Sequence, residues 1–191
     1  MNCLGAGAAW ACVLGLAPAC AAPSARAPSS QAGAPVLERA SVATAPELCG
    51  NALDDNGNGL ADEGCGTTTS AVSFLIAWDE PNADVDLRVV DPNGELVEVG
   101  RPSESGLVRE RDCPGRDGEC RGKNLESVYQ EQGEPATGKY VARILLVSLG
   151  GGEPPVVVRF SARLGARAYG TTVTLPRVDA DWQMEIGRAH V

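Results

Sequence analysis

The residues best suited to chemistry lie in one acidic segment between Cys49 and Cys65. Counted from Asp54, oxygen-bearing side chains stand at positions 1, 3, 5 and 9, with a glycine at position 6 and a leucine at position 7. This spacing is typical of a loop that wraps a calcium ion, because Ca²⁺ prefers hard oxygen ligands and a glycine permits the sharp turn. The predicted calcium ligands are Asp54, Asn56, Asn58, Leu60 through its backbone carbonyl, Asp62 and Glu63.

The predicted calcium site lacks the ligand that usually ends such a loop. Position 12 is Cys65, whereas a glutamate there normally binds the ion with two oxygens. A weak site of this kind suits a compartment rich in calcium, unless Glu63 or water supplies the missing oxygens. Copper fits less well because no histidine or methionine lies near the loop. The alternative is a turn rich in Asp, Asn and Gly that a disulfide closes without any metal.

The seven cysteines of the chain divide into two groups. Cys20 and the two cysteines before it belong to an apolar leader. Four remain, an even number that predicts two disulfides in an exported chain. Their spacing does not match the paired spacing of a four-cysteine zinc site. Proximity in the sequence favours the pairs Cys49–Cys65 and Cys113–Cys120.

A second group of acidic residues accompanies the apolar stretch from Val72 to Gly94. Alternating apolar residues predict a buried strand over 72–79 and a strand from Asp84 onward that buries only one face. The turn residues between them predict a β-hairpin with an acidic tip. The carboxylates of this stretch form a second, weaker candidate cation site or, alternatively, brace the turns by hydrogen bonds. They belong to Asp79, Asp84, Asp86 and Asp91.

Motifs in the same region resemble those of the YfaP-like bacterial β-sandwich domains of unknown function. The matching residues are Trp78-Asp79, Asp84-x-Asp86-Leu87, Asp91-Pro92-x-Gly94, Ser105-Gly106, Asp112-Cys113, Asn124, Gly133, Pro135 and Gly138-x-Tyr140-Val141. The resemblance covers residues 72–175 and implies an extracytoplasmic sandwich, but no particular reaction. The segment from Cys49 to Cys65 is similar to the MopE-type Cys-Gly-Asn…Asp-Glu-Gly-Cys repeat of bacterial surface proteins, which implies metal binding.

Short apolar runs separated by turns continue towards the end of the chain. Strands are predicted over 138–148, 156–164, 169–175 and 181–185, whereas 95–132 has the character of a loop. This loop is predicted to be charged and solvated, with an anionic ligand such as a polysaccharide carboxylate as the alternative. The arginines considered for such a ligand are Arg109, Arg111, Arg116 and Arg121. The pattern predicts an all-β fold, an antiparallel β-sandwich of about 7–8 strands.

The two ends of the chain carry segments that do not belong to the predicted sandwich. Cys20 is a candidate site of lipidation at the end of an export signal. His190, the only histidine, should carry no function, because the last residues resemble a translated sequencing adapter. The predicted organisation is a signal peptide (1–22), a disordered Ala/Pro/Ser-rich tether (23–46), the disulfide-closed calcium loop (47–66), the β-sandwich (70–184) and the adapter-like end (185–191).

The composition narrows the class of function. With a formal net charge of −9, the chain shows no basic face for nucleic acid. Phosphate-binding and zinc-protease motifs are absent, and without a credible histidine no Ser-His-Asp triad can be assembled. We therefore expect a non-catalytic calcium-binding module of the cell envelope, a lipoprotein or a secreted protein, whose partner is a cell-surface protein or a polysaccharide. The alternatives are a glycan-active hydrolase with an Asp pair and a purely structural accessory domain.

Overall fold

The computed structural model describes residues 36–39, 46–114, 120 and 123–187. The predictions for the signal peptide, Cys20, most of the tether, Arg116, Arg121 and His190 lie outside the described residues. Within the described ranges, no helix is both long and apolar enough to cross a membrane.

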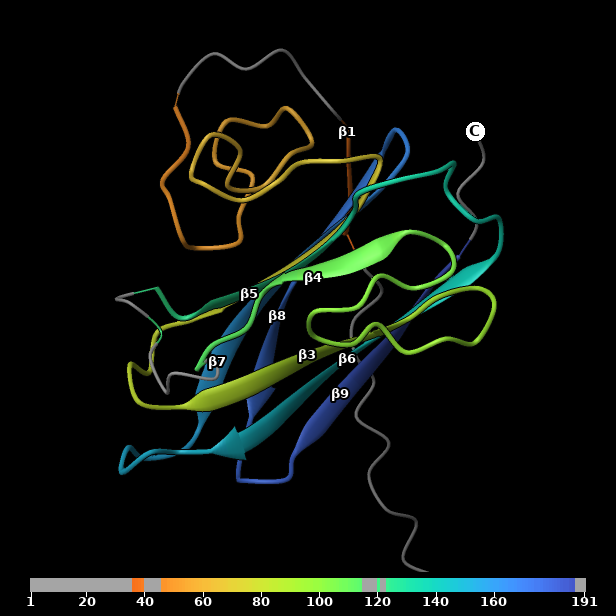
Figure 1. Ribbon diagram of the computed structural model, residues 1–191. Coiled ribbons are helices and arrows are strands. Elements are labelled where there is room, and N and C mark those ends of the chain that lie inside the picture. Colours follow the sequence, from red (N-terminus) through yellow and green to blue (C-terminus); the bar gives the residue numbers. More distant parts are fainter. Residues whose placement is uncertain (1–35, 40–45, 115–119, 121–122, 188–191) are drawn as a thin grey trace, which may run out of the picture. The chain divides into compact units, whose positions relative to one another are not determined.

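The described residues form strands joined by turns, and they contain no helix. Alternation of apolar and polar residues at a period of two accounts for most of these strands. Their bounds are β1 Val36–Arg39, β2 Val72–Trp78, β3 Asp84–Val90, β4 Leu107–Arg111, β5 Leu125–Gln130, β6 Lys139–Ser148, β7 Val156–Leu164, β8 Arg167–Leu175 and β9 Asp181–Gly187 (Figure 1).

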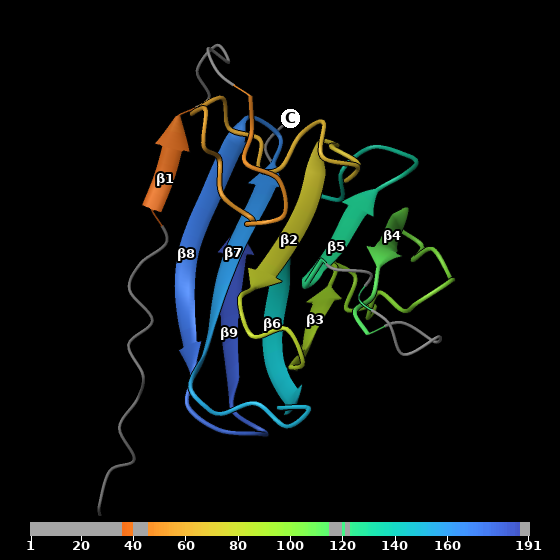
Figure 2. The same cartoon turned by 90° about the vertical axis from the view of Figure 1, so that its left-hand side faces the viewer.

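The strands make two antiparallel sheets that pack face to face. The larger sheet has the order β1-β8-β7-β2-β5-β4 and the smaller one the order β3-β6-β9. Figure 2 looks onto the larger sheet, with the smaller sheet behind it. The prediction of an all-β antiparallel sandwich is confirmed, and β1 is a strand that the sequence pattern did not indicate.

The prediction of a hairpin between β2 and β3 is wrong. β2 pairs with β5 and β7, whereas β3 pairs with β6 in the other sheet, so the turn after β2 carries the chain from one sheet to the other. The indole Nε1 of Trp78 donates a hydrogen bond of 3.0 Å to the Ala83 carbonyl and closes this corner. Local turn chemistry is the same for a hairpin and for a corner, so the sequence pattern did not separate them.

The prediction that residues 95–132 form a loop is also wrong in part. β4 and β5 lie in this range, and β5 is an inner strand of the larger sheet, paired with β2 and β4. The charged residues in β4 and β5 favoured the prediction of a loop, because a charged side chain is normally exposed to solvent. In β5 one of them, Glu126, is only 1% exposed.

The core lies between the inner faces of the two sheets. Every second residue of β6 and β7 is buried over most of each strand, which confirms the predicted strands over 138–148 and 156–164. On β2 the outer face is buried as well, since Leu75 and Ala77 pack with Leu125 and with Ala52 of the segment 47–66. This segment, which we call the acidic loop, lies over the outer face of the larger sheet (Figure 2).

The first part of the adapter-like end belongs to β9. Ile186 is 2% exposed and lies in the core, and Glu185 pairs with Lys139 of β6 across 2.8 Å. These contacts show that residues up to Gly187 complete a strand. The foreign origin of residues 185–191 stays a prediction.

Candidate metal sites

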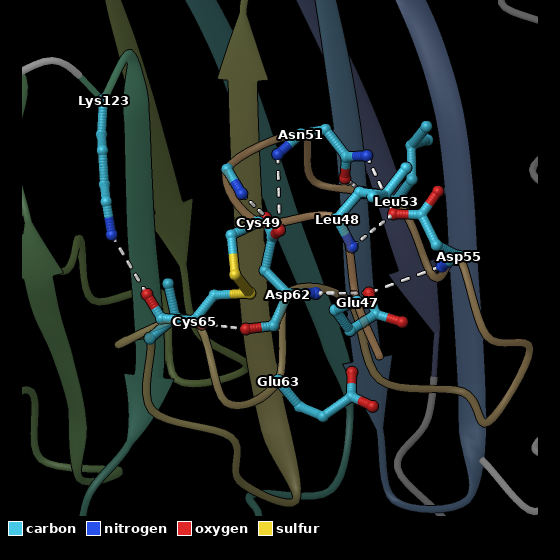
Figure 3. Close-up of a disulfide and its surroundings, with 12 residues drawn as sticks. Glu47, Leu48, Cys49, Asn51, Leu53, Asp55, Asp62, Glu63, Cys65 and Lys123 are labelled. Carbon is cyan, nitrogen blue, oxygen red and sulfur yellow. Dashed lines mark hydrogen bonds between the residues drawn. A yellow bond between two sulfur atoms is a disulfide. The ribbon is translucent and has the colours of Figure 1, made fainter. Parts of the chain in front are cut away.

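Both predicted disulfides are present in the structure. Cys49 and Cys65 are joined at the base of the acidic loop with Cα atoms 5.3 Å apart (Figure 3). Cys113 and Cys120 close a second loop between β4 and β5. The first disulfide holds together a loop whose own apolar contacts are few, because only Ala52 and Ala61 of the loop join a hydrophobic cluster.

The middle of the acidic loop turns around the carboxylate of Asp54. Its Oδ1 accepts a hydrogen bond of 2.9 Å from the Asn58 amide, and its Oδ2 accepts one of 2.7 Å from the Gly59 amide. Gly59 adopts φ 84°, the left-handed conformation that a glycine allows at low cost. The predicted role of this glycine in the sharp turn is confirmed.

Glu63 faces two of the other predicted ligands. Its Oε1 accepts hydrogen bonds of 2.6 Å from the side-chain amides of both Asn56 and Asn58. Its Oε2 is buried and has no hydrogen-bond partner among the described residues. Three of the six predicted calcium ligands thus meet at one place, and one carboxylate oxygen there is unsatisfied.

The carboxylate of Asp62 points to the backbone next to the disulfide (Figure 3). Its Oδ1 accepts a hydrogen bond of 2.6 Å from the Gly50 amide, and its Oδ2 accepts one of 2.8 Å from the Ala52 amide. The residue is fully buried and has φ 53°. Asp62 therefore braces the start of the loop in this structure, and its role as a calcium ligand stays a prediction.

Glu47 was not among the predicted site residues. Its Oε1 accepts a hydrogen bond of 3.1 Å from the Asn56 amide. Its Oε2 accepts one of 3.1 Å from the Asp62 amide (Figure 3). Burial raises the pKa of this carboxyl, while the backbone donors oppose the increase. The only signal in the sequence for a carboxylate that binds the loop backbone is an acidic residue two positions before Cys49.

Positive side chains contact the acidic loop through its backbone. Arg159 Nε donates to the Asn51 carbonyl at 2.7 Å, and Lys123 Nζ donates to the Cys65 carbonyl at 3.1 Å. Within the described residues, no ion pair involves a carboxylate of the loop. The loop carries the acids Glu47, Asp54, Asp55, Asp62 and Glu63 and no Lys or Arg.

The four carboxylates of the second predicted site do not converge. Asp79 is mostly exposed and forms a two-pronged pair with Arg159, which lowers the pKa of Asp79. Asp91 is buried in the turn after β3, where its Oδ1 accepts hydrogen bonds from two backbone amides. Asp84 and Asp91 lie at opposite ends of β3, roughly 20 Å apart for an extended strand of this length.

Asp86 instead lies beside two acids, Asp112 and Glu126, that were not among the predicted ligands. The carboxylates of Asp86, Asp112 and Glu126 offer oxygens within 4.8 Å of one another, so this triad could hold a metal ion. Arg109 already contacts it, with Nη1 2.8 Å from Asp112 and 3.6 Å from Glu126. The side chain of Arg109 is only 8% exposed. The prediction that Arg109 lies in a solvated loop is therefore wrong.

Glu126 and Arg109 also bridge the two sheets. The carboxylate of Glu126 accepts hydrogen bonds of 2.6 Å from the Leu87 amide and 3.2 Å from the Cys113 amide, and Arg109 donates to the Leu87 carbonyl. β3 is an edge strand, so these two side chains satisfy the backbone groups that an adjacent strand would otherwise bind. Burial raises the pKa of Glu126 to about 8, against the lowering effect of Arg109 and the backbone donors.

Comparisons with known proteins give no relative for this chain. No family model matches it, and neither a curated protein nor a solved structure matches it.

Proposed function

We propose that this chain is an exported, non-catalytic β-sandwich module that binds calcium in the acidic loop and a partner or polymer at the cell envelope. The observation that carries the proposal is the position of Glu63. One of its oxygens accepts hydrogen bonds from the side-chain amides of Asn56 and Asn58, and the other is buried without a hydrogen-bond partner in the described part of the chain. A buried, unpartnered carboxylate oxygen costs free energy, and a cation bound there would remove that cost.

The charge of the acidic loop supports a cation. Five carboxylates crowd into twenty residues without a single basic residue, and the nearby arginine and lysine donate to backbone carbonyls instead. Like charges at this density repel one another, and a divalent ion neutralises two of them at once. Calcium is the preferred ion because carboxylate, amide and carbonyl oxygens are hard ligands.

The disulfides and the short sequence motifs support an exported location. Structural disulfides persist mainly in oxidising compartments, and two of them close loops in this chain. A weak calcium site is useful outside the cytoplasm, where calcium is plentiful. The YfaP-like and MopE-type resemblances agree with a protein of the cell envelope, and lipidation at Cys20 is part of the same proposal.

The test is thermal unfolding of the oxidised chain with calcium added or chelated. A hundredfold excess of calcium over its Kd should stabilise the fold by about 2.7 kcal/mol. For a domain of this size, this amount raises Tm by roughly 10 °C. Asp54→Asn and Glu63→Gln should each abolish most of the increase, because each replaces a charged carboxylate of the proposed site by a neutral amide with only one oxygen.

Asp55→Asn is the matched control for this test. Asp55 lies in the same loop, but it is exposed and directs its carboxylate to the Leu48 amide and to Asn51. The calcium response should survive in this variant. If the Tm of the wild type is the same with calcium and with chelator, the proposed calcium site is refuted. The segment is then the disulfide-closed turn without metal.

A further inference from the structure

We infer that the outer edge of β8 is a dimerisation surface, to which a second copy of this chain adds its own β8 in the antiparallel direction. On one side, β7 pairs with β8 along the whole strand. On the other side, β1 pairs only with residues 167–170 (Figure 2). Within the described ranges, residues 171–175 have no neighbouring strand on that side, and we call them the open edge. The inference goes beyond the proposed function and does not require calcium.

The open edge carries none of the features that normally protect the edge of a sheet. Its sequence, Thr-Thr-Val-Thr-Leu, contains no charged residue, no proline and no glycine, and its register with β7 continues without a bulge. Threonine and valine are residues that strands favour. An edge strand presents a row of amide and carbonyl groups that can bind another strand, so proteins usually place charges, prolines or bulges there. The open edge is therefore suited to pairing.

The other edge strands among the described residues are protected. β1 is only four residues long, and β4 contains three charged residues in succession and an irregular register with β5. At β3, Glu126 and Arg109 bind the amide and the carbonyl of Leu87. β9 carries the charged residues Asp181 and Glu185. This contrast singles out the open edge as the place where a further strand can add.

The side chains of the open edge already have the positions that a paired strand requires. Val173 and Leu175 are buried in the core, whereas Thr172 and Thr174 are exposed on the outer face of the larger sheet. A strand that adds here extends the larger sheet without any rearrangement of the sandwich. Its own side chains would alternate in the same way, between the core side and the exposed threonines.

A second β8 fits the open edge because the two ends of the edge match. At one end, β1 occupies the edge up to residue 170. At the other end, Pro176 has no amide hydrogen to donate, and the chain leaves for β9 in the other sheet. Two antiparallel copies centred on Val173 pair residues 171–175 of both chains. Pro176 of one copy then lies where β1 of the other copy begins, so the two copies do not collide.

The cross-strand contacts of this dimer are favourable. Val173 lies opposite Val173 of the second copy, and Thr172 lies opposite Thr174 of the second copy, twice by symmetry. Pairs of threonines and pairs of β-branched residues stabilise neighbouring strands. The acidic loop shares a cleft with residues 168–172, towards the other end of β8. Antiparallel pairing therefore places the two acidic loops towards opposite ends of the joint sheet, which limits their repulsion.

The sequence before β1 is less suited to this edge than a second β8. A continuation of β1 in the same register would place residues 31–35, Gln-Ala-Gly-Ala-Pro, opposite the open edge. Alanine, glycine and proline are residues that strands disfavour, and proline cannot donate a hydrogen bond to β8. The threonines and the valine of a second β8 have the higher preference for a strand.

The experiment is sedimentation velocity of the oxidised chain over a range of concentrations, with two double variants at exposed positions. Thr172→Lys with Thr174→Lys places lysine opposite lysine twice in the dimer. Thr172→Lys with Thr174→Glu places lysine opposite glutamate twice, and it is the matched control because it changes the same two positions. Both threonines are exposed, so neither variant disturbs the core.

We expect the wild type and the Lys/Glu variant to form dimers with similar Kd, and the Lys/Lys variant to have a Kd higher by about tenfold or more. A Lys/Lys variant that dimerises as tightly as the wild type, or a Lys/Glu variant as weak as the Lys/Lys variant, would overturn the inference. A monomeric wild type would also overturn it and would leave the open edge to a strand of another protein or to the chain's own N-terminal residues. The dimer should form equally with calcium and with chelator, so its absence would not bear on the proposed calcium site.

Discussion

The buried carboxyl of Glu126 makes the stability of the sandwich depend on pH. Glu126 lies on β5 and is 1% exposed, and it faces Arg109 of β4, Asp112 of the following turn and Asp86 of β3. Its pKa is raised from 4.5 to about 8, mainly by burial. The folded protein therefore binds a proton that the unfolded chain releases between these two pH values.

The sign of the effect follows from this difference in proton binding. Between pH 4.5 and about 8 the folded state holds more protons than the unfolded state, so the free energy of unfolding falls as pH rises. At 1.36 kcal/mol for each pH unit, the free energy of unfolding falls by at most about 5 kcal/mol across the whole window. The contribution is fully present below pH 4.5 and is lost above about pH 8.

The assay is urea unfolding of the wild type and of Glu126→Gln at intervals from pH 4.5 to pH 8.5. The glutamine side chain cannot ionise, but it keeps an oxygen that can accept the hydrogen bond from the Leu87 amide. The two proteins should be similar in stability at low pH, and the variant should become more stable than the wild type as pH rises, by up to a few kcal/mol. Titrating groups that do not interact with Glu126 are common to both proteins, and their contributions cancel in the difference.

The opposite trend would refute this reasoning. If the wild type gains stability over Glu126→Gln with rising pH, the carboxylate is ionised in the folded protein and its attraction to Arg109 exceeds the cost of burial. A difference that does not vary with pH would mean that the pKa of Glu126 is the same in both states. Glu126→Leu is a useful third protein, because loss of both acceptors should cost about 3 kcal/mol or more at any pH.

Three further changes test other parts of the fold by urea unfolding. Cys49→Ser opens the acidic loop and should lower the free energy of unfolding by about 3 kcal/mol, the loop-closure value for a disulfide of this span. An unchanged urea midpoint would show that the loop packs without the disulfide. Gly106→Ala should cost at least about 2 kcal/mol, because Gly106 has φ 79° and a Cβ there would lie 2.1 Å from the Gln132 carbonyl. Asp79→Ala should change stability by less than about 1 kcal/mol, since its pair with Arg159 is exposed, and a larger loss would assign the pair a structural role.

The strands with one apolar face could be predicted from the sequence, since burial of one face imposes a period of two. In β6 the buried residues Tyr140 and Ile144 alternate with more exposed neighbours, as burial of one face requires. The pairing of strands could not be predicted, because β2 finds its partners far along the chain and the turn after it is compatible with either sheet.

The candidate sites divide in the same way. The Asp54 turn and the disulfide across the loop follow from local spacing, and both are found in the structure. The triad of Asp86, Asp112 and Glu126 comes from the strands β3 and β5 and from the turn after β4, which meet only in the folded protein. A buried charge cannot be separated from a solvated one by the identity of the residue alone, which is why Glu126 and Arg109 were missed.

The position of β2 in the larger sheet has a consequence for the order in which the chain folds. Phe74 pairs with Val128 on one side and with Ala162 on the other, and both partners are synthesised long after β2 itself. Contacts so distant in the sequence form slowly, because a long loop must close before they stabilise anything. During synthesis this apolar strand therefore has no partner until β5 emerges and gains its second partner only with β7, and an apolar strand left unpaired in that interval is prone to aggregation.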